Sequence, residues 1–321
     1  MTPAELYRDL GVSNRVYEFN ACIRSHEDPA VRQTRQQLNE TDYQVTWETP
    51  VGSHFAVFRA SENSPWHMPI KFAVVTEADL KVAAWREEHR TYSWDQERYE
   101  KLCATWQGLG APQCYMPRVS IQKLIVEEAG TEGTMYAVAD YPATVERYFE
   151  ALKVRDQRFI EVIAASPLQI INFGDNVHAG IVSPRLFAKY ILPVYQWRCE
   201  RLRAAGKFTN AHWDGDTGPI LKYARGTGLD GIEAITPVPQ GDVTLEQARA
   251  ALGEMYLLDG IPAVYFDKTY SVKELLDCAR KCIELFAPHL ILGISDEISS
   301  TGDIERVRRV TEVVDEYNAS L

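Results

Sequence analysis

The chain has 321 residues, of which 45% are hydrophobic and 25% charged, so it carries ample apolar material for a globular core. Its formal net charge of −11 argues against nucleic acid and against an anionic membrane surface as partners. No run of about 18 apolar residues is present to span a bilayer, and the N-terminus lacks the apolar core of a signal peptide. We therefore expect a cytoplasmic protein.

The first part of the chain predicts local elements without a regular repeat. Residues 42–61 alternate in the manner of a β-hairpin, with "TPVG" as its turn. Residues 76–90 predict an amphipathic helix opened by Thr76, with Asp79 three positions later in a variant of the capping box. The proline-containing stretch 64–72 could form a lid. We expect residues 1–115 to be an elaboration and the first barrel units of one domain that covers residues 1–321.

The second half of the chain alternates strand-like and helix-like segments, a rhythm typical of right-handed βαβ units and a parallel sheet. The pattern predicts an α/β fold, a (β/α)8 TIM barrel with an N-terminal α/β-hairpin elaboration; an open doubly wound sheet is the alternative. Strands are expected at 168–173, 208–212, 230–235, 255–260 and 290–294, and helices at 184–205, 217–226, 245–252, 271–286 and 303–317.

One strand ends in the polar segment "KFTNAHWDGD" (207–216). Side chains alternate along a strand, so Asn210, His212 and Asp214 would project the same way. An imidazole and a carboxylate so placed can hold a divalent metal or bind a polar substrate. The structural alternative is a helix N-terminus near Thr217, capped by Asp214 or Asp216.

Polar residues also follow the neighbouring predicted strands. Because the carboxyl ends of parallel strands form the edge where active sites of α/β proteins lie, these residues are candidates for a shared site. They are Asn172, Asp175, Asn176, His212, Asp214, Glu233, Asp259, Asp296 and Glu297.

Several of these segments resemble the uroporphyrinogen decarboxylase superfamily. The resemblance is carried by "NFGDNVHAGIVSPRLFAKYILPVY" (172–195), by the strand with its histidine-containing turn, by "DGIE" (230–233) and by "GDVTLEQARAALG" (241–253). "ETPVGS" (48–53) is placed like the N-terminal hairpin of the branch related to corrinoid-linked methyltransferases. The decarboxylase's arginine-rich N-terminal motif is missing, which argues against a porphyrinogen substrate.

The resemblance to the methyltransferase branch implies a metal site. That branch commonly binds zinc through a histidine-x-cysteine after one strand and a cysteine after the last. These positions fall on His212, on Asp214 and near Asp296, and Glu233 is a plausible fourth ligand. Carboxylates in place of thiolates make a harder site that suits zinc, manganese, iron or magnesium, and the resemblance favours zinc.

The remaining candidates receive roles in catalysis or substrate binding. We expect Asp175 and His212 to act as acid–base groups. Each binding candidate has a structural alternative, such as an exposed loop position for His178, an interior hydrogen bond for Asn210 and a turn for the Asp259–Gly260 pair. The residues expected to bind substrate are Asn176, His178, Asn210, Trp213 and Asp259.

Three functions compete. The preferred one is a methyltransferase that moves a methyl group between a small methylated substrate and a corrinoid protein or a thiol. The corrinoid would belong to a partner protein, because the chain contains no "DxHxxG" segment. The alternatives are a decarboxylase of a small acid that uses Asp175 and His212 as acid–base groups, and a non-enzymatic binding module. The sequence leaves open whether the chain forms a homodimer.

Overall fold

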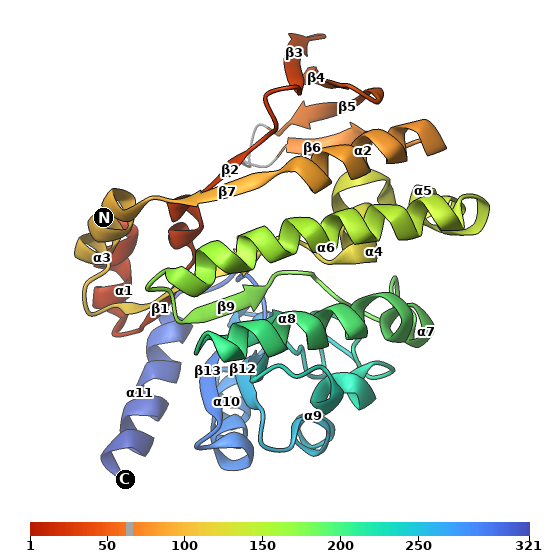
Figure 1. Ribbon diagram of the computed structural model, residues 1–321. Coiled ribbons are helices and arrows are strands. Elements are labelled where there is room, and N and C mark those ends of the chain that lie inside the picture. The colour runs from red at the N-terminus through yellow and green to blue at the C-terminus, as the bar shows by residue number, and fades with distance from the viewer. Residues whose placement is uncertain (62–66) are drawn as a thin grey trace. The chain divides into compact units, whose positions relative to one another are not determined.

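The computed structural model describes residues 1–61 and 67–321, which fold into two compact units (Figure 1). The first, here called the barrel unit, comprises Met1–Cys22, Asp95–Met116 and Pro167–Leu321. The second, the insert unit, comprises Ile23–Trp94 and Pro117–Ser166. The chain therefore leaves the barrel unit and returns to it twice. The expectation of one domain over residues 1–321 stays a prediction.

The barrel unit is built on a parallel, TIM-like half-barrel, which confirms the predicted fold class. Its strands follow the chain in their spatial order, with β1 and β13 at the two ends. Among the described residues this sheet has seven strands, where the sequence predicted the eight of a complete barrel. The strands between β1 and β8 in the chain belong to antiparallel sheets of the insert unit. The strands are β1 (Asn14–Val16), β8 (Gly110–Met116), β9 (Ile170–Phe173), β10 (Phe208–His212), β11 (Gly231–Glu233), β12 (Tyr256–Ile261) and β13 (Leu290–Ile294).

Most predicted helices of the barrel unit are confirmed within a few residues. Capping boxes at Ser271 and Thr244 start α10 and α9, as the Ser/Thr-x-x-Glu/Gln pattern predicts. Helices α8 and α10 pack against the strands (Figure 1). The helices are α1 (Pro3–Leu10), α3 (Gln96–Thr105), α7 (Pro184–Leu186), α8 (Leu192–Ala204), α9 (Leu245–Leu252), α10 (Val272–Phe286) and α11 (Glu305–Ala319).

Two helix predictions need correction. The helix expected at 184–205 contains a π-helical turn at Phe187–Ile191, just before Pro193, which has no N–H for the regular ladder. The helix expected at 217–226 is only the 3-10 helix Leu221–Gly226. Its predicted cap by Asp216 is also wrong, because the N–H groups of Thr217 and Gly218 donate to Asp242 Oδ1 at 2.8 and 3.0 Å.

The insert unit combines antiparallel strands with helices. The predicted hairpin is confirmed as β4 (Asp42–Thr49) and β5 (Gly52–Ala60), and Thr76 caps α2 (Glu77–His89) with Asp79 as predicted. Residues 64–66 of the predicted lid lie outside the described residues, and β6 (His67–Lys71) extends the hairpin sheet. The other elements are β2 (Ile23–His26), β3 (Arg32–Gln37), β7 (Thr91–Trp94), α4 (Ser120–Lys123), α5 (Gly130–Asp140) and α6 (Pro142–Ala165).

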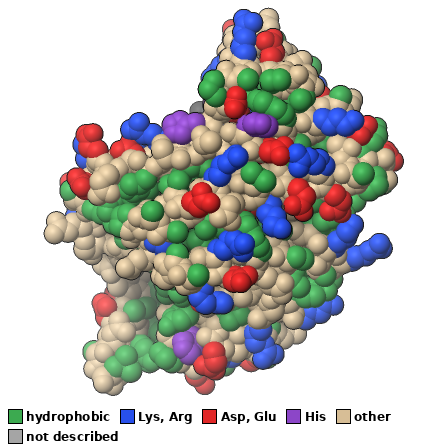
Figure 2. All heavy atoms as spheres, viewed as in Figure 1, with side chains coloured by type: hydrophobic (Ala, Val, Ile, Leu, Met, Phe, Trp, Pro, Cys, Tyr) green, Lys and Arg blue, Asp and Glu red, His purple; other side chains and the backbone are tan. Residues whose placement is uncertain are grey.

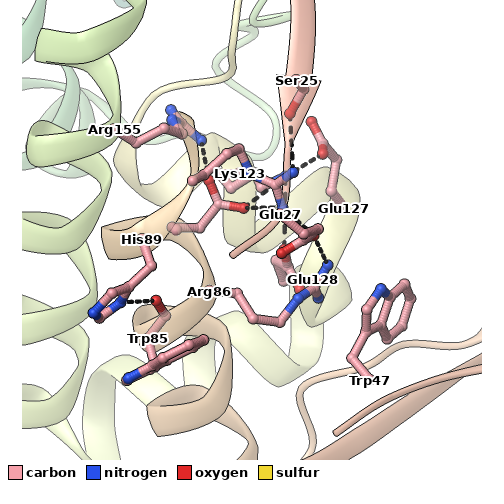
Figure 3. Close-up of polar contacts among 12 residues, drawn as sticks. Ser25, Glu27, Trp47, Trp85, Arg86, His89, Lys123, Glu127, Glu128 and Arg155 are labelled. Atoms are coloured by element: carbon pink, nitrogen blue, oxygen red, sulfur yellow. Dashed lines mark hydrogen bonds and ion pairs between the residues drawn. The ribbon is translucent and has the colours of Figure 1, made fainter. Parts of the chain in front are cut away.

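A network of ion pairs fills part of the insert unit (Figure 3). Arg155, which is only 1% exposed, contacts Glu87 at 3.1 Å and Asp156 at 2.7 Å. Burial raises the pKa of Glu87, but the charges of Lys123, Arg155 and Arg90 outweigh it and bring that pKa down to about 2. The carboxylate of Glu87 is thus ionised inside the unit because cations surround it.

The surface carries side chains of both charges, and the described helices differ from a membrane span in length or hydropathy. Figure 2 shows acidic and basic side chains interspersed over the visible face. Among the described residues, none of the helices is both long and apolar enough to cross a membrane.

Acid should destabilise the insert unit through His54, whose imidazole is 3% exposed. Its Nε2 accepts from Arg86 Nη1 at 3.1 Å, and burial together with the Arg86 charge lowers the pKa of His54 from 6.5 to about 4. The unfolded chain therefore takes up this proton first. Stability is complete above pH 6.5 and falls towards pH 4, by up to about 3 kcal/mol.

Urea denaturation of the full chain at pH values between 7.5 and 4.5 measures this loss. The variant His54→Gln should show a flatter dependence over the same range. An equal dependence in the variant and the wild type would mean that other groups cause the acid lability.

Candidate active site

The candidate site lies where β9, β10 and β11 of the barrel unit end. Asn172 pairs in register with Asn210, and His212 pairs with Glu233. Residues in register across parallel strands share a face, and so do residues two apart along one strand. The sheet therefore presents these four polar side chains on one face, as the sequence predicted for Asn210 and His212.

Glu233 is the centre of this group, and its carboxylate is almost completely buried. Tyr17 O–H donates to Glu233 Oε1 at 2.6 Å, and Arg15 Nη1 lies 2.6 Å from the same oxygen. Asn172 Nδ2 donates to Glu233 Oε2, and His212 Nδ1 lies 3.5 Å from that oxygen. These five residues are called the Glu233 cluster below.

Asp259 joins the cluster through Arg15. The Nη2 of Arg15 donates to both carboxylate oxygens of Asp259, at 2.7 and 2.9 Å. Asp259 has a φ of +85°, and Ala234 and Asn176 also have positive φ values, of 65° and 51°. Non-glycine residues held in this region carry backbone strain, which is characteristically found at functional sites. Here the strained residues fall in β12 and just after β11 and β9.

The charges of the cluster shift its pKa values in opposite directions. Burial raises the pKa of Glu233, but Arg15 and His212 outweigh it and lower that pKa. Burial lowers the pKa of His212, but the hydrogen bond and charge of Glu233 reverse this and raise it. Burial raises the pKa of Asp259 against the opposing charge of Arg15. Glu233 is therefore an anion beside an imidazole that favours its protonated form, which suits His212 to donate a proton.

Asp175, the second predicted acid–base group, is fully buried after β9. Its Oδ2 accepts a hydrogen bond from the O–H of Tyr195 on α8, at 2.9 Å. Burial and the Asp175 charge together raise the pKa of Tyr195 far above its usual value, so this hydroxyl keeps its proton. The pair places a carboxylate and a phenol together at the end of β9.

The uroporphyrinogen decarboxylase (URO-D) family matches residues 123–317, which include β9 to β13 and the ends that carry Glu233 and His212. The chain belongs to the URO-D family. The resemblance noted in the sequence is thereby confirmed. No curated protein sequence matches the chain.

Solved structures similar to this URO-D family member include the following two. A methyltransferase from Methanosarcina mazei shares 12% sequence identity, with a TM-score of 0.59 over 81% of this chain and 75% of that one. A B12-independent methionine synthase from Shewanella sp. W3-18-1, in complex with selenomethionine, shares 12% identity with a TM-score of 0.47 over 99% of this chain and 86% of that one. At this identity, the first similarity establishes the fold.

The remaining predicted substrate-binding residues differ in their burial and in their distance from the strand ends. Asn176 is exposed and His178 half-buried, in a loop joined to β10 by a hydrogen bond from Val177 N to His212 O at 3.2 Å. Trp213 is fully buried and packs edge-on against Phe187, with the ring centroids 5.2 Å apart. The structure thus brings the His178 loop to the end of β10 and places the Trp213 ring in the core.

The predicted metal ligands do not form one donor set in this structure. Among the described residues, no three His, Cys, Asp or Glu side chains are arranged to hold a metal ion. Both oxygens of Glu233 are engaged by the cluster, and Asp296 is exposed, with its Oδ1 accepting from the N–H of Glu297 at 2.8 Å. Asp214 is half-buried, and its charge helps to raise the pKa of His212. The arrangement therefore does not fit a metal held by these four residues.

Sequence reasoning missed Arg15, Tyr17 and Tyr115. Tyr17 stacks on Tyr115, with ring centroids 4.0 Å apart and an interplanar angle of 5°, and this contact aims its hydroxyl at Glu233. Arg15 stands on a strand of three residues, and Tyr17 opens the short 3-10 helix Tyr17–Cys22. A strand of three residues is too short for an alternating pattern to reveal it.

Gly174→Ala should disturb the support of the site by steric overlap alone. A Cβ at position 174 would lie 2.5 Å from Cδ1 of Tyr115, so the tyrosine ring would have to leave its stack on Tyr17. We expect a loss of about 1–3 kcal/mol in the free energy of unfolding. Denaturant unfolding measures it, with Gly226→Ala as the control.

At Gly226 nothing lies within 4 Å of the added Cβ, so that variant should be neutral or slightly stabilised. Equal stabilities for the two variants would show that Tyr115 can move at no cost.

Proposed function

We propose that this URO-D family member is a methyltransferase that moves a methyl group between a small methylated compound and a corrinoid protein or a thiol. The observation that carries the proposal is the His212–Glu233 pair, in which a buried carboxylate favours a protonated imidazole at the carboxyl ends of the strands. The shared fold with a methyltransferase from Methanosarcina mazei supports it.

His212 would supply the proton that the reaction requires. When a nucleophile takes the methyl carbon, the bond from that carbon to oxygen, nitrogen or sulfur breaks and its electrons stay on the heteroatom. The imidazolium of His212 protonates this leaving heteroatom, and Glu233 stabilises the charge of the imidazolium before transfer. In the direction of corrinoid methylation, a cobalt(I) corrinoid carried by a partner protein would be the nucleophile. The partner protein and a homodimer stay predictions.

Asp214 would orient the substrate. Its Oδ1 is buried without a hydrogen-bond partner among the described residues, two positions after His212. A buried acceptor of this kind is costly unless a donor reaches it, and an N–H or O–H of a substrate would satisfy it. This favours methylated compounds that retain a donor close to the methyl-bearing atom.

The charges of the site count against decarboxylation of a small acid. Asp214, Glu233 and Asp259 place three carboxylates near His212, and Arg15 is already held by two of them. A carboxylate substrate would meet like charges there, which disfavours its binding. Asp175 and His212 as acid–base groups of a decarboxylase are therefore the second choice.

A spectroscopic assay tests the proposal. The purified chain is mixed with free cob(I)alamin, as a stand-in for the corrinoid protein, and with a panel of methylamines, methoxyaryl compounds and methyl thioethers. We expect one class to convert the cob(I)alamin spectrum, with the demethylated product detected by mass spectrometry. Carbon dioxide release from a panel of small acids, with no methyl transfer from any donor, would establish decarboxylation instead.

A further inference from the structure

Arg15 links the first strand of the half-barrel to two strands near the other end of the sheet. It comes from β1, at one end of the sheet order, and its guanidinium contacts Glu233 on β11 and Asp259 on β12, towards the other end. Tyr17, two residues later, contacts Glu233 as well. One short N-terminal segment thus delivers both a cation and a hydrogen-bond donor to the carboxylates.

The two carboxylates need a cation. Their side chains are 3% and 5% exposed, and an ionised carboxylate so deeply buried is unfavourable unless an opposite charge and hydrogen bonds compensate it. Arg15 meets this need with two nitrogens of its planar fork, one at 2.6 Å from Glu233 and the other bonded to both oxygens of Asp259.

The same contacts occupy the oxygens that a divalent metal would use. Oε1 of Glu233 faces Arg15 and Tyr17, Oε2 faces Asn172 and His212, and both oxygens of Asp259 accept from Arg15. A metal ion that bound both carboxylates would have to compete with the guanidinium for these oxygens.

We propose that Arg15 is the resident cation of this site, in the place that a divalent metal would otherwise take beside His212, Glu233 and Asp259. In this role Arg15 is a positioning residue, because it fixes the carboxylates that surround His212. This role of Arg15 does not depend on which reaction the site performs, because it concerns only the cation that neutralises the two carboxylates.

The glycine at position 293 leaves space for the carboxylate of Asp259, which Arg15 contacts. A Cβ at Gly293 on β13 would lie 2.5 Å from Oδ1 of Asp259, so a side chain there would displace the carboxylate from Arg15. The strained φ of +85° at Asp259 likewise holds its side chain in this arrangement.

Metal binding to the full chain, without a polyhistidine tag, tests the proposal. Wild type, Arg15→Lys and Arg15→Met are stripped with chelator and reloaded with Zn2+ or Mn2+, and metal is measured by mass spectrometry and by competition with a chromogenic chelator. Wild type and Arg15→Lys should retain almost no metal. Arg15→Met should gain about one ion per chain, because its carboxylates and His212 become free ligands.

Two further variants make the result decisive. Adding His212→Ala to Arg15→Met should abolish the gain, which assigns the metal to this site. Adding Asp259→Asn to Arg15→Met relieves the repulsion between carboxylates and covers the case in which the single variant does not fold. The proposal is overturned if wild type binds one ion that His212→Ala removes, or if folded variants lacking Arg15 gain none.

Discussion

Replacing Arg155 with methionine should lower the free energy of unfolding by about 3–5 kcal/mol. The Arg155 side chain is 1% exposed, and the substitution would leave the carboxylates of Glu87 and Asp156 in the interior without this partner. It would also remove the hydrogen bond to the carbonyl oxygen of Arg118, at 2.9 Å. Urea denaturation of the full chain, followed by circular dichroism, measures the loss.

Arg147→Met on the same helix is the matched control. Arg147 contacts Glu88 at 2.6 Å, but its side chain is 59% exposed, so solvent screens the pair. Loss of an exposed pair should change stability by no more than about 1 kcal/mol. If the two variants were equally stable, burial of the ion pairs in the insert unit would not be what makes Arg155 important.

Replacing His212 with asparagine should lower kcat for methyl transfer by about 10²–10⁴-fold, because the leaving group would lose its proton donor. The wild-type rate should fall as the pH rises through the pKa of His212, which Glu233 holds above the usual histidine value. The variant should lack this part of the profile and keep its KM within a few-fold. Steady-state rates between pH 6 and 9 measure both effects.

His289→Asn is the control for any general effect of losing a histidine beside a glutamate. His289 Nδ1 lies 3.4 Å from Glu254, and the residue precedes β13, at the amino-terminal edge of the sheet. Its replacement should leave the rate within about twofold, since active sites of such folds lie at the opposite edge. A His212→Asn variant with a nearly normal rate would rule out His212 as the proton donor.

The sequence predicted the strands and the capped helices of the barrel unit because their signals are local. The segment 208–212 forms β10, and residues 245–252 form α9 behind the capping box of Thr244. In contrast, the segment from Thr217 takes its cap from Asp242, a residue of a later loop. No pattern around Thr217 reports such a distant partner, so the helix there was predicted too long.

The candidate site was predicted only in part, because some of its residues carry local signals and others meet only through distant contacts. His212 and Glu233 stand at the ends of strands that the sequence shows, and the register brings them together. Arg15 is more than two hundred positions away in the sequence and meets Glu233 only after the sheet has formed. The predicted metal site of His212, Asp214, Glu233 and Asp296 takes no account of this arginine. The charge of Arg15 already compensates Glu233, which is one of the predicted ligands.

The division of the chain between two units also has a consequence for synthesis. β1 pairs with β8, Asn14 opposite Gly110, yet the whole segment Ile23–Trp94 of the insert unit lies between them. At about 5–20 residues per second, a ribosome needs several seconds to extend the nascent chain from one strand to the next. During that time β1, which carries Arg15, has no partner strand to pair with. A chaperone that binds the nascent chain early would therefore have access to this unpaired segment.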